Sequence, residues 1–279
     1  MNKYTIGIIG GTGSMGRWFE RFFSQSGHKI LISGRKTKLT PHELVKKCDI
    51  VILSTPIDIT VRMAREIGPL LSKDQLFTDF CSLKEDVVKT MLNSSNCHVI
   101  GMHPMFGPFT DSIKGQNIIL CPGRGTDWID WLEGEFKQRG GIVTRMDPVT
   151  HDKNMAVFQG LTHLLSITMG RTLQKMNMPP AKVKEYSTPV FKVNIDLIGR
   201  LFAQDLGLYS NLVGGNKYVK ETIETFLTAL KEGEECLLSG NKEKGIGFLE
   251  NIRDFLGDFC QTGMEESNEI LNTLLKKLI

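Results

Sequence analysis

The residue whose setting most favours chemistry is His103, in the segment Gly101–Pro108 (GMHPMFGP). Pro104 and Pro108 stiffen this segment, because each ring fixes φ near −65° and restricts the residue before it. The apolar stretch His98–Gly101 indicates a buried strand, so we expect the imidazole on a stiff loop at a strand's carboxyl end, where open α/β sheets bind ligands. Imidazole titrates near neutral pH, which suits acid–base catalysis. The alternative is a loop histidine packed against its neighbours.

A glycine-rich segment near the start of the chain has the spacing G-x-G-x-x-G. It follows a predicted strand, Thr5–Ile9, and opens a predicted helix, Met15–Ser26, which is the context that a dinucleotide-binding loop requires. The first turn of such a helix offers free backbone amides and a partial positive charge to phosphate groups. The predicted cofactor contacts in this loop are Gly11, Thr12, Gly13, Ser14, Met15 and Gly16.

The end of the second predicted strand bears on which dinucleotide is bound. NAD enzymes usually have an acidic residue there, whereas an arginine accommodates the 2′-phosphate of NADP. This chain has Ser33 and Arg35 at that point and no acidic residue between Glu20 and Glu43. Arg35 can form charge-assisted hydrogen bonds to a phosphate, so we expect NADP, with NAD as the alternative. A solvated basic loop would have the same composition.

Two further loops are expected at the same edge of the sheet. Thr55 and Pro56 follow the third predicted strand and are candidate cofactor contacts. Ser82 follows the fourth predicted strand, and its hydroxyl could orient the imidazole of His103. Thr55 and Ser82 could instead be ordinary helix N-caps.

Polar residues beside an apolar helical stripe suggest the wall of a substrate cleft. Asp152, Gln159, His163, Ser166 and Gly170 fall within an arc of about 60° at 100° per residue. The five residues are therefore candidates for a cleft wall. A partly solvated helix edge would show the same pattern.

Arg200 stands in a strongly apolar helical segment, where an unpaired guanidinium would be costly. Asp196, four residues earlier, could form an ordinary ion pair with it. The guanidinium could instead bind a substrate carboxylate through two parallel hydrogen bonds. Both interpretations stay open at this point.

The elements that position these residues change character near residue 150. Before it, apolar runs alternate with amphipathic stretches, which predicts a Rossmann-type, doubly wound parallel sheet in residues 1–150. After it, residues 151–279 show only helical periodicity, which predicts an all-helical domain for substrate binding and dimerisation. The two closing helices are expected at 218–239 and 242–278. The predicted strands are Thr5–Ile9, Lys29–Ile32, Ile50–Leu53, Leu76–Thr78, His98–Gly101, Asn117–Leu120 and Ile142–Thr144.

Composition limits the class of protein. With 279 residues, 41% hydrophobic and 23% charged, the chain is typical of a globular protein with room for two domains. A net charge of +3 favours neither nucleic acid nor a membrane surface as partner. The amino terminus lacks the layout of a signal peptide, and the six cysteines include no C-x-x-C pair, so we expect reduced thiols, no metal site and a cytoplasmic protein.

Four segments together resemble the prephenate dehydrogenases of the TyrA family over nearly the whole chain. Two of them are close to the dehydrogenase half of bifunctional chorismate mutase–prephenate dehydrogenases, whose mutase half we do not expect here. The four segments are Ile9–Gly16, Gly101–Pro108, His151–Ala156 and Gly199–Asp205.

The resemblance implies oxidative decarboxylation of prephenate to 4-hydroxyphenylpyruvate, with hydride transfer to the nicotinamide. The amphipathic closing helices would suit a homodimer interface, with an internal core as the alternative. The resemblance also implies that His103 accepts the hydroxyl proton with support from Ser82, and that Arg200 binds a carboxylate beside His163 and Gln159. Alternatives are an arogenate dehydrogenase, another NADP-dependent dehydrogenase or imine reductase of the same plan, and a non-catalytic NADPH-responsive regulator. Phe109 stands six residues after His103, so a gating carboxylate is not expected there.

Overall fold

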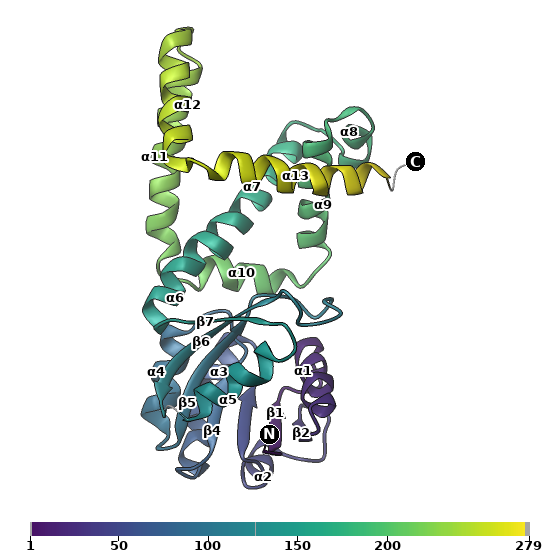
Figure 1. Ribbon diagram of the computed structural model, residues 1–279, viewed down its shortest axis with the longest axis vertical. Helices are drawn as coiled ribbons and strands as arrows, with labels where there is room; N and C mark the ends of the chain where they lie inside the picture. The colour runs from purple at the N-terminus through teal and green to yellow at the C-terminus, as the bar shows by residue number, and fades with distance from the viewer. Residues whose placement is uncertain (1, 126, 277–279) are drawn as a thin grey trace. The chain divides into compact units, whose positions relative to one another are not determined.

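A mixed β-sheet organises the amino-terminal part of the chain (Figure 1). The structure is a computed structural model that describes residues 2–125 and 127–276. Within these ranges the sheet has seven strands in the order β2-β1-β3-β4-β5-β6-β7, and each corresponds to a predicted strand. The strands are β1 (Thr5–Ile9), β2 (Lys29–Ser33), β3 (Ile50–Leu53), β4 (Leu76–Asp79), β5 (His98–Pro104), β6 (Asn117–Arg124) and β7 (Ile142–Arg145).

Pairing in the sheet is parallel except between β5 and β6. The predicted doubly wound parallel sheet is therefore confirmed. Among the described strands the β5–β6 pair is the exception, because residues 105–116 contain no crossover helix and a short connection joins antiparallel neighbours. The pairing also extends β5 to Pro104, so that His103 lies opposite Ile119 inside a strand. The expectation that His103 stands on a loop is therefore wrong. The β5 strand continues because β6 provides partners up to the Pro104–Ile118 pair.

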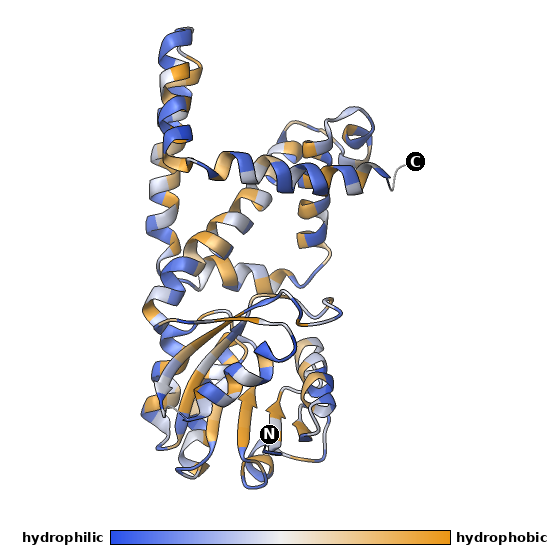
Figure 2. Ribbon diagram, in the orientation of Figure 1, coloured by the Kyte–Doolittle hydropathy of each residue, from blue (hydrophilic) through white to orange (hydrophobic). Residues whose placement is uncertain are grey.

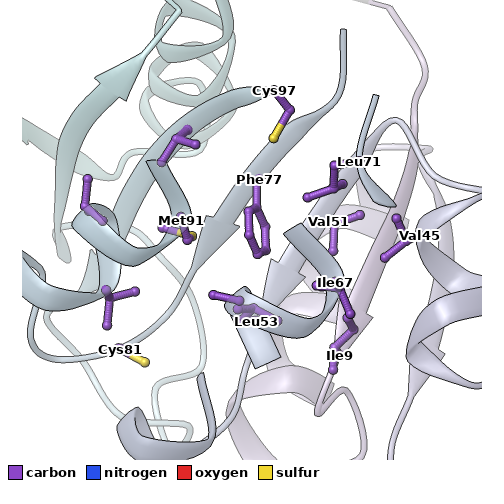
Figure 3. Close-up of a cluster of buried hydrophobic side chains, with 14 of the residues drawn as sticks. Ile9, Val45, Val51, Leu53, Ile67, Leu71, Phe77, Cys81, Met91 and Cys97 are labelled. Atoms are coloured by element: carbon purple, nitrogen blue, oxygen red, sulfur yellow. The ribbon is translucent and has the colours of Figure 1, made fainter. Parts of the chain in front are cut away.

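Helices cover both faces of the sheet, as the apolar strands require. Ile50 and Ile52 of β3 pack with α1 and α5 on one face. Val51 and Leu53 pack with α2, α3, α4 and α6 on the other face, and Figure 3 shows this second cluster. Colouring by hydropathy shows the same arrangement, with apolar strands and mixed helices (Figure 2). The helices are α1 (Ser14–Gln25), α2 (Pro41–Val45), α3 (Ile57–Ile67) with the short 3-10 turn η1 (Gly68–Leu70), α4 (Glu85–Ser94), α5 (Asp127–Lys137) and α6 (Pro148–Met155).

The chain forms two compact units, Met1–Met155 and Ala156–Ile279. The described residues of the second unit contain helices and no strand, as predicted, and none of these helices is long and apolar enough to cross a membrane. Cofactor binding by residues 1–150 and substrate binding by residues 151–279 stay predictions. The elements are the π-helix η2 (Ala156–Leu161), α7 (Thr162–Lys175), α8 (Pro180–Tyr186), α9 (Pro189–Phe202), α10 (Leu206–Gly214), α11 (Val219–Leu237), α12 (Lys242–Leu256) and α13 (Phe259–Lys276).

Proline and glycine explain where these helices begin and end. Pro189 is the first residue of α9, and the Thr188 hydroxyl accepts a hydrogen bond from the Phe191 amide. The single closing helix predicted at 242–278 is wrong, because it divides at Gly257. Gly257 has φ +54, a left-handed conformation that favours glycine and ends α12. The predicted end of that helix, at Leu278, lies outside the described residues.

Candidate active site

The glycine loop is tied to the end of strand β2. The amides of Gly10 and Gly11 both donate to the Ser33 carbonyl, at 2.7 and 3.2 Å, and the Gly13 amide donates to the Gly10 carbonyl at 3.0 Å. Gly13 is the N-cap of α1 and has no side chain to cap the helix, so the first amides of α1 stay available to an anion.

Side chains would not fit in this loop. A Cβ atom on Gly16 would lie 2.6 Å from the Gly11 Cα atom, and one on Gly11 would lie 2.6 Å from Ile32 Cγ2. Gly10 has φ +84, and a Cβ there would lie 2.2 Å from the Ser54 carbonyl oxygen. The loop therefore brings bare backbone to the helix amino terminus, which fits the pyrophosphate of a dinucleotide.

A basic turn lies beside the glycine loop. The Gly34 amide donates to the Thr37 hydroxyl at 2.9 Å, and the buried Ser33 hydroxyl donates to the Leu39 carbonyl at 2.8 Å. A Cβ on Gly34 would lie 2.6 Å from Thr12 Oγ1, which places the turn against the loop. Ser33 thus holds both the turn and the loop, and a direct contact with a cofactor stays a prediction. The exposed cationic side chains of the turn are Arg35, Lys36 and Lys38.

Thr55 and Ser82 lie in the loops after β3 and β4, as expected, but neither is a helix N-cap. The Thr55 Oγ1 atom lies 2.8 Å from Thr60 Oγ1, while Pro56 is the N-cap of α3. Ser82 precedes the N-cap of α4, Lys84, by two residues. The supporting role of Ser82 for His103 stays a prediction.

The His103 imidazole is in contact with a second histidine. His103 Nδ1 lies 2.9 Å from His151 Nε2, and His151 Nδ1 lies 2.7 Å from Asp152 Oδ1. The Asp152 carboxylate also accepts the backbone amides of Lys84 and Glu85, at 2.8 and 2.9 Å. Both imidazoles and the carboxylate are buried in the first unit. The sequence pattern assigned no catalytic role to His151 or Asp152, although the adjacent pair stands in a segment that carries the family resemblance.

Burial controls the charge of the two histidines. Loss of solvation lowers the pKa of His103 well below 6.5, and the nearby His151 and Lys84 lower it further. Burial likewise lowers the pKa of His151, although the hydrogen bond to Asp152 opposes this shift. Both rings are therefore neutral at pH 7. A neutral imidazole is the protonation state that accepts a proton.

A buried ion pair holds the residue before His103. Lys84 Nζ pairs with Asp79 Oδ2 and donates to the Met102 carbonyl at 3.0 Å, and Asp79 Oδ1 accepts the Met102 amide at 3.4 Å. The side chains of Lys84 and Asp79 are both 0% exposed. Gly101 provides the room, because a Cβ there would lie 3.0 Å from Lys84 Cδ and 2.5 Å from Val88 Cγ2. Sequence reasoning missed this pair.

Three candidate substrate residues lie in the second unit. The His163 ring packs edge-on against Tyr209, with ring centroids 5.0 Å apart. Burial raises the pKa of Tyr209, and the positive charge of Arg200 opposes that shift, so Arg200 lies near the phenol. Arg200 is exposed, and Asp196 pairs with Lys184 at 2.5 Å. The expectations of a desolvated guanidinium and of an Arg200–Asp196 pair are therefore wrong.

The predicted polar strip is interrupted. Asp152 lies in α6 and bonds to the start of α4, Gln159 lies in the π-helix η2, and His163 lies in α7. A π-helix has more residues per turn than the 100° spacing assumes, so the single arc predicted for these residues is wrong. Gly160 allows η2 to pack on α11, because a Cβ there would lie 2.4 Å from Val219 Cγ2.

Two family models match the chain. The model described as prephenate dehydrogenase, nucleotide-binding domain, matches residues 29–145. The model described as prephenate dehydrogenase, dimerization domain, matches residues 147–253.

Individual relatives give the same result. The chain is 31% identical to a probable arogenate/prephenate dehydrogenase of Methanocaldococcus jannaschii, over 98% of this chain and 66% of that protein. It is 29% identical to the T-protein of Haemophilus influenzae, over 96% of this chain and 71% of that protein. Among solved structures it is similar to prephenate dehydrogenase from A. aeolicus in complex with hydroxyphenyl propionate and NAD+. The TM-score is 0.72 and the identity 23%, covering 91% of this chain and 97% of that one. The likeness to this structure supports the fold.

Proposed function

Because the chain belongs to the prephenate dehydrogenase family, we propose that this dehydrogenase converts prephenate to 4-hydroxyphenylpyruvate and CO₂ with reduction of NADP. The observation that carries the proposal is the buried, neutral imidazole of His103 on β5. In the sheet, β5 lies next to β4 and two strands from β3, so His103 stands at the carboxyl edge with the loops that follow those two strands. Arogenate is the alternative substrate, since it differs from prephenate only in having an amino group in place of the side-chain keto oxygen.

Different groups in the site act at different steps of the proposed reaction. The bound nicotinamide supplies the acceptor for the hydride that leaves C4. His103 accepts the proton of the C4 hydroxyl, so that the oxygen gains the electrons of the O–H bond as the C–H bond breaks. The ring carboxylate then leaves as CO₂, its bonding electrons complete the aromatic ring, and the oxygen on C4 takes a proton back from His103 to give the phenol. The ion pair of Lys84 and Asp79 keeps the strand end that bears His103 in place.

The preference for NADP rests on the basic turn after β2. Arg35, Lys36 and Lys38 are exposed on a turn held by internal hydrogen bonds and packed on Thr12 of the glycine loop. A 2′-phosphate would be bound there by charge-assisted hydrogen bonds, whereas NAD offers no such charge. Gly11, Gly13, Ser14, Met15, Gly16, Ser33, Thr55 and Pro56 are the further proposed cofactor contacts.

The second unit supplies the proposed substrate contacts and the dimer. Arg200, exposed on α9 and near Tyr209, is suited to bind a carboxylate of prephenate, with His163 and Gln159 as further contacts. The dimerization-domain match supports a homodimer. Large apolar side chains that such an interface would cover are exposed on α11, α12 and α13, among them Leu230, Leu249, Phe255 and Phe259.

Steady-state kinetics with both substrates and both nucleotides test this function. We expect nucleotide reduction and CO₂ release with prephenate and NADP. His103→Asn should lower kcat by about 10²–10⁴-fold with little change in KM, because proton acceptance helps only in the transition state. Arg200→Gln should mainly raise the KM for prephenate. The absence of nucleotide reduction with prephenate and with arogenate, under either nucleotide, would refute the proposed function.

The cofactor assignment has its own test. Arg35→Asp should raise the KM for NADP by about tenfold to a hundredfold, because a charged hydrogen bond to the 2′-phosphate is lost. The KM for NAD should change little. Lys73→Asp, an exposed lysine in the turn before β4, is the matched control for a change of surface charge. A wild-type enzyme that prefers NAD tenfold in kcat/KM would contradict the assignment.

A further inference from the structure

The hydrogen bonds around His103 form a chain with a definite direction. Its last member, the Asp152 carboxylate, can only accept, and it accepts two amides at the start of α4 as well as a bond from His151. His151 must therefore donate from Nδ1, which leaves its Nε2 as an acceptor in the neutral ring. The atom 2.9 Å from that Nε2 is His103 Nδ1, so the neutral His103 donates from Nδ1 and has its lone pair on Nε2.

We propose that His151 and Asp152 are a positioning pair that fixes the orientation and tautomer of His103, so that Nε2 is the atom that accepts the substrate proton. This inference rests on the proposed function and adds two residues to it. His103 receives the proton on Nε2 and retains its Nδ1–H bond to His151. Asp152 supplies a negative charge that is connected to the resulting cation through one imidazole.

Other charged groups near the two histidines affect whether either ring can carry a positive charge. Lys84 is buried within reach of both histidines and disfavours a positive charge on either. Asp79 pairs directly with Lys84, and its negative charge raises the pKa of His151. Cys121, on the neighbouring strand β6, has its pKa raised to about 12 and stays neutral. Asp152 is the anion that is hydrogen-bonded to His151 itself.

The fold explains how the pair is held. The N-cap of α4, Lys84, makes no side-chain capping bond, and the Asp152 carboxylate takes that place from a helix 67–68 residues further along the chain. A carboxylate at a helix amino terminus interacts favourably with the helix dipole. Two bonds to α4 fix the carboxylate, and the carboxylate then fixes the His151 ring.

Substitutions at His151 separate hydrogen bonding from packing. His151→Gln places an amide oxygen where it can still accept the His103 Nδ1–H bond, whereas His151→Leu fills the space without an acceptor. We expect kcat to fall less than about tenfold in the first variant and about 10²–10³-fold in the second, with prephenate KM little changed. Equal losses in the two variants would overturn the acceptor role of His151.

Asp152→Asn tests the charge and the tautomer. The amide group can donate to His151, which reverses both tautomers and puts a proton on His103 Nε2, so we expect kcat to fall by about 10²–10⁴-fold. The limb of the kcat–pH profile that reports the histidine pair should also move to lower pH, because removal of an anion disfavours the imidazolium. The control is Asp86→Asn, which removes an exposed carboxylate from the same end of α4 and should change neither. A uniform loss of kcat without movement of the limb would indicate a structural role only.

A spectroscopic readout does not depend on activity. In long-range ¹H–¹⁵N spectra of histidine-labelled wild-type protein, His103 and His151 should both show a protonated Nδ1 and an unprotonated Nε2. The opposite tautomer at His103 would overturn the inference. If wild-type protein turns over neither substrate, the proposed function fails. If the wild type is active while Asp152→Asn and His151→Leu turn over normally, only the positioning pair fails.

Discussion

Removal of the Lys84 ammonium tests the argument that a buried ion pair holds the strand end before His103. In Lys84→Met the side chain keeps its length, but Asp79 loses its cationic partner and the Met102 carbonyl loses a donor. Asp79 keeps two backbone donors, the amides of Cys81 and Met102. Because both charged side chains are 0% exposed, solvent cannot replace the lost partner. Removing one member of such a pair costs about 3–5 kcal/mol of stability.

Urea unfolding followed by tryptophan fluorescence measures this cost in the first unit. The chain has three tryptophans, Trp18, Trp128 and Trp131, and all of them lie within Met1–Met155. With a slope of about 3 kcal/mol per molar urea, the midpoint of Lys84→Met should fall by roughly 1 M or more.

The double variant Asp79→Asn/Lys84→Met removes both charges together. It should recover much of the loss, because a buried pair replaced by neutral groups is often close to neutral in stability. A midpoint shift below about 0.3 M for Lys84→Met, at that same slope, would refute the buried-pair argument. A double variant less stable than Lys84→Met would refute it too.

Three further predictions concern the glycines and the buried histidines. Gly16→Ala should lower nucleotide affinity at least about tenfold in a binding titration, because its Cβ would lie 2.6 Å from backbone of the loop. Gly160→Ala should destabilise the second unit by about 1–3 kcal/mol, since its Cβ would press on the buried Val219; unchanged thermal unfolding followed by circular dichroism would contradict this. Burial lowers the pKa of three histidines in the folded protein, so just below pH 6.5 the unfolded chain binds more protons than the folded chain. The urea midpoint should therefore decrease as the pH is lowered from about 7.5 to 5.5. A midpoint that does not change over this range would argue against the lowered pKa values. These histidines are His103, His151 and His163.

The sheet was largely predictable because its strands are short apolar runs with little polar alternation. Ile50–Leu53 is an example, since each of its four residues is buried against one helical layer or the other. The reversal between β5 and β6 was not predicted, because strand pattern carries no direction and only the short connection at 105–116 reveals it. The missing β5–β6 pairing also explains why His103 was expected on a loop, since the β6 partner that extends β5 comes later in the chain.

The glycine loop and His103 could be recognised because their signals are local. One residue separates Gly11 from Gly13, two residues separate Gly13 from Gly16, and His103 lies next to Pro104. The partners of His103 gave no such signal. His151 is 48 residues from His103, and Asp152 is 68 residues from Lys84, so only the fold brings them together.

Lys84 connects the stability of the first unit to the chemistry of the site. Its ammonium binds Asp79 and the Met102 carbonyl, while its backbone amide binds the Asp152 carboxylate that orients His151. A loss of the ammonium therefore affects the strand before His103, and a shift of the Lys84 backbone affects the carboxylate. It follows that Lys84→Met should lower kcat as well as stability, whereas Asp152→Asn, which leaves the buried ion pair intact, should lower kcat far more than it lowers the urea midpoint.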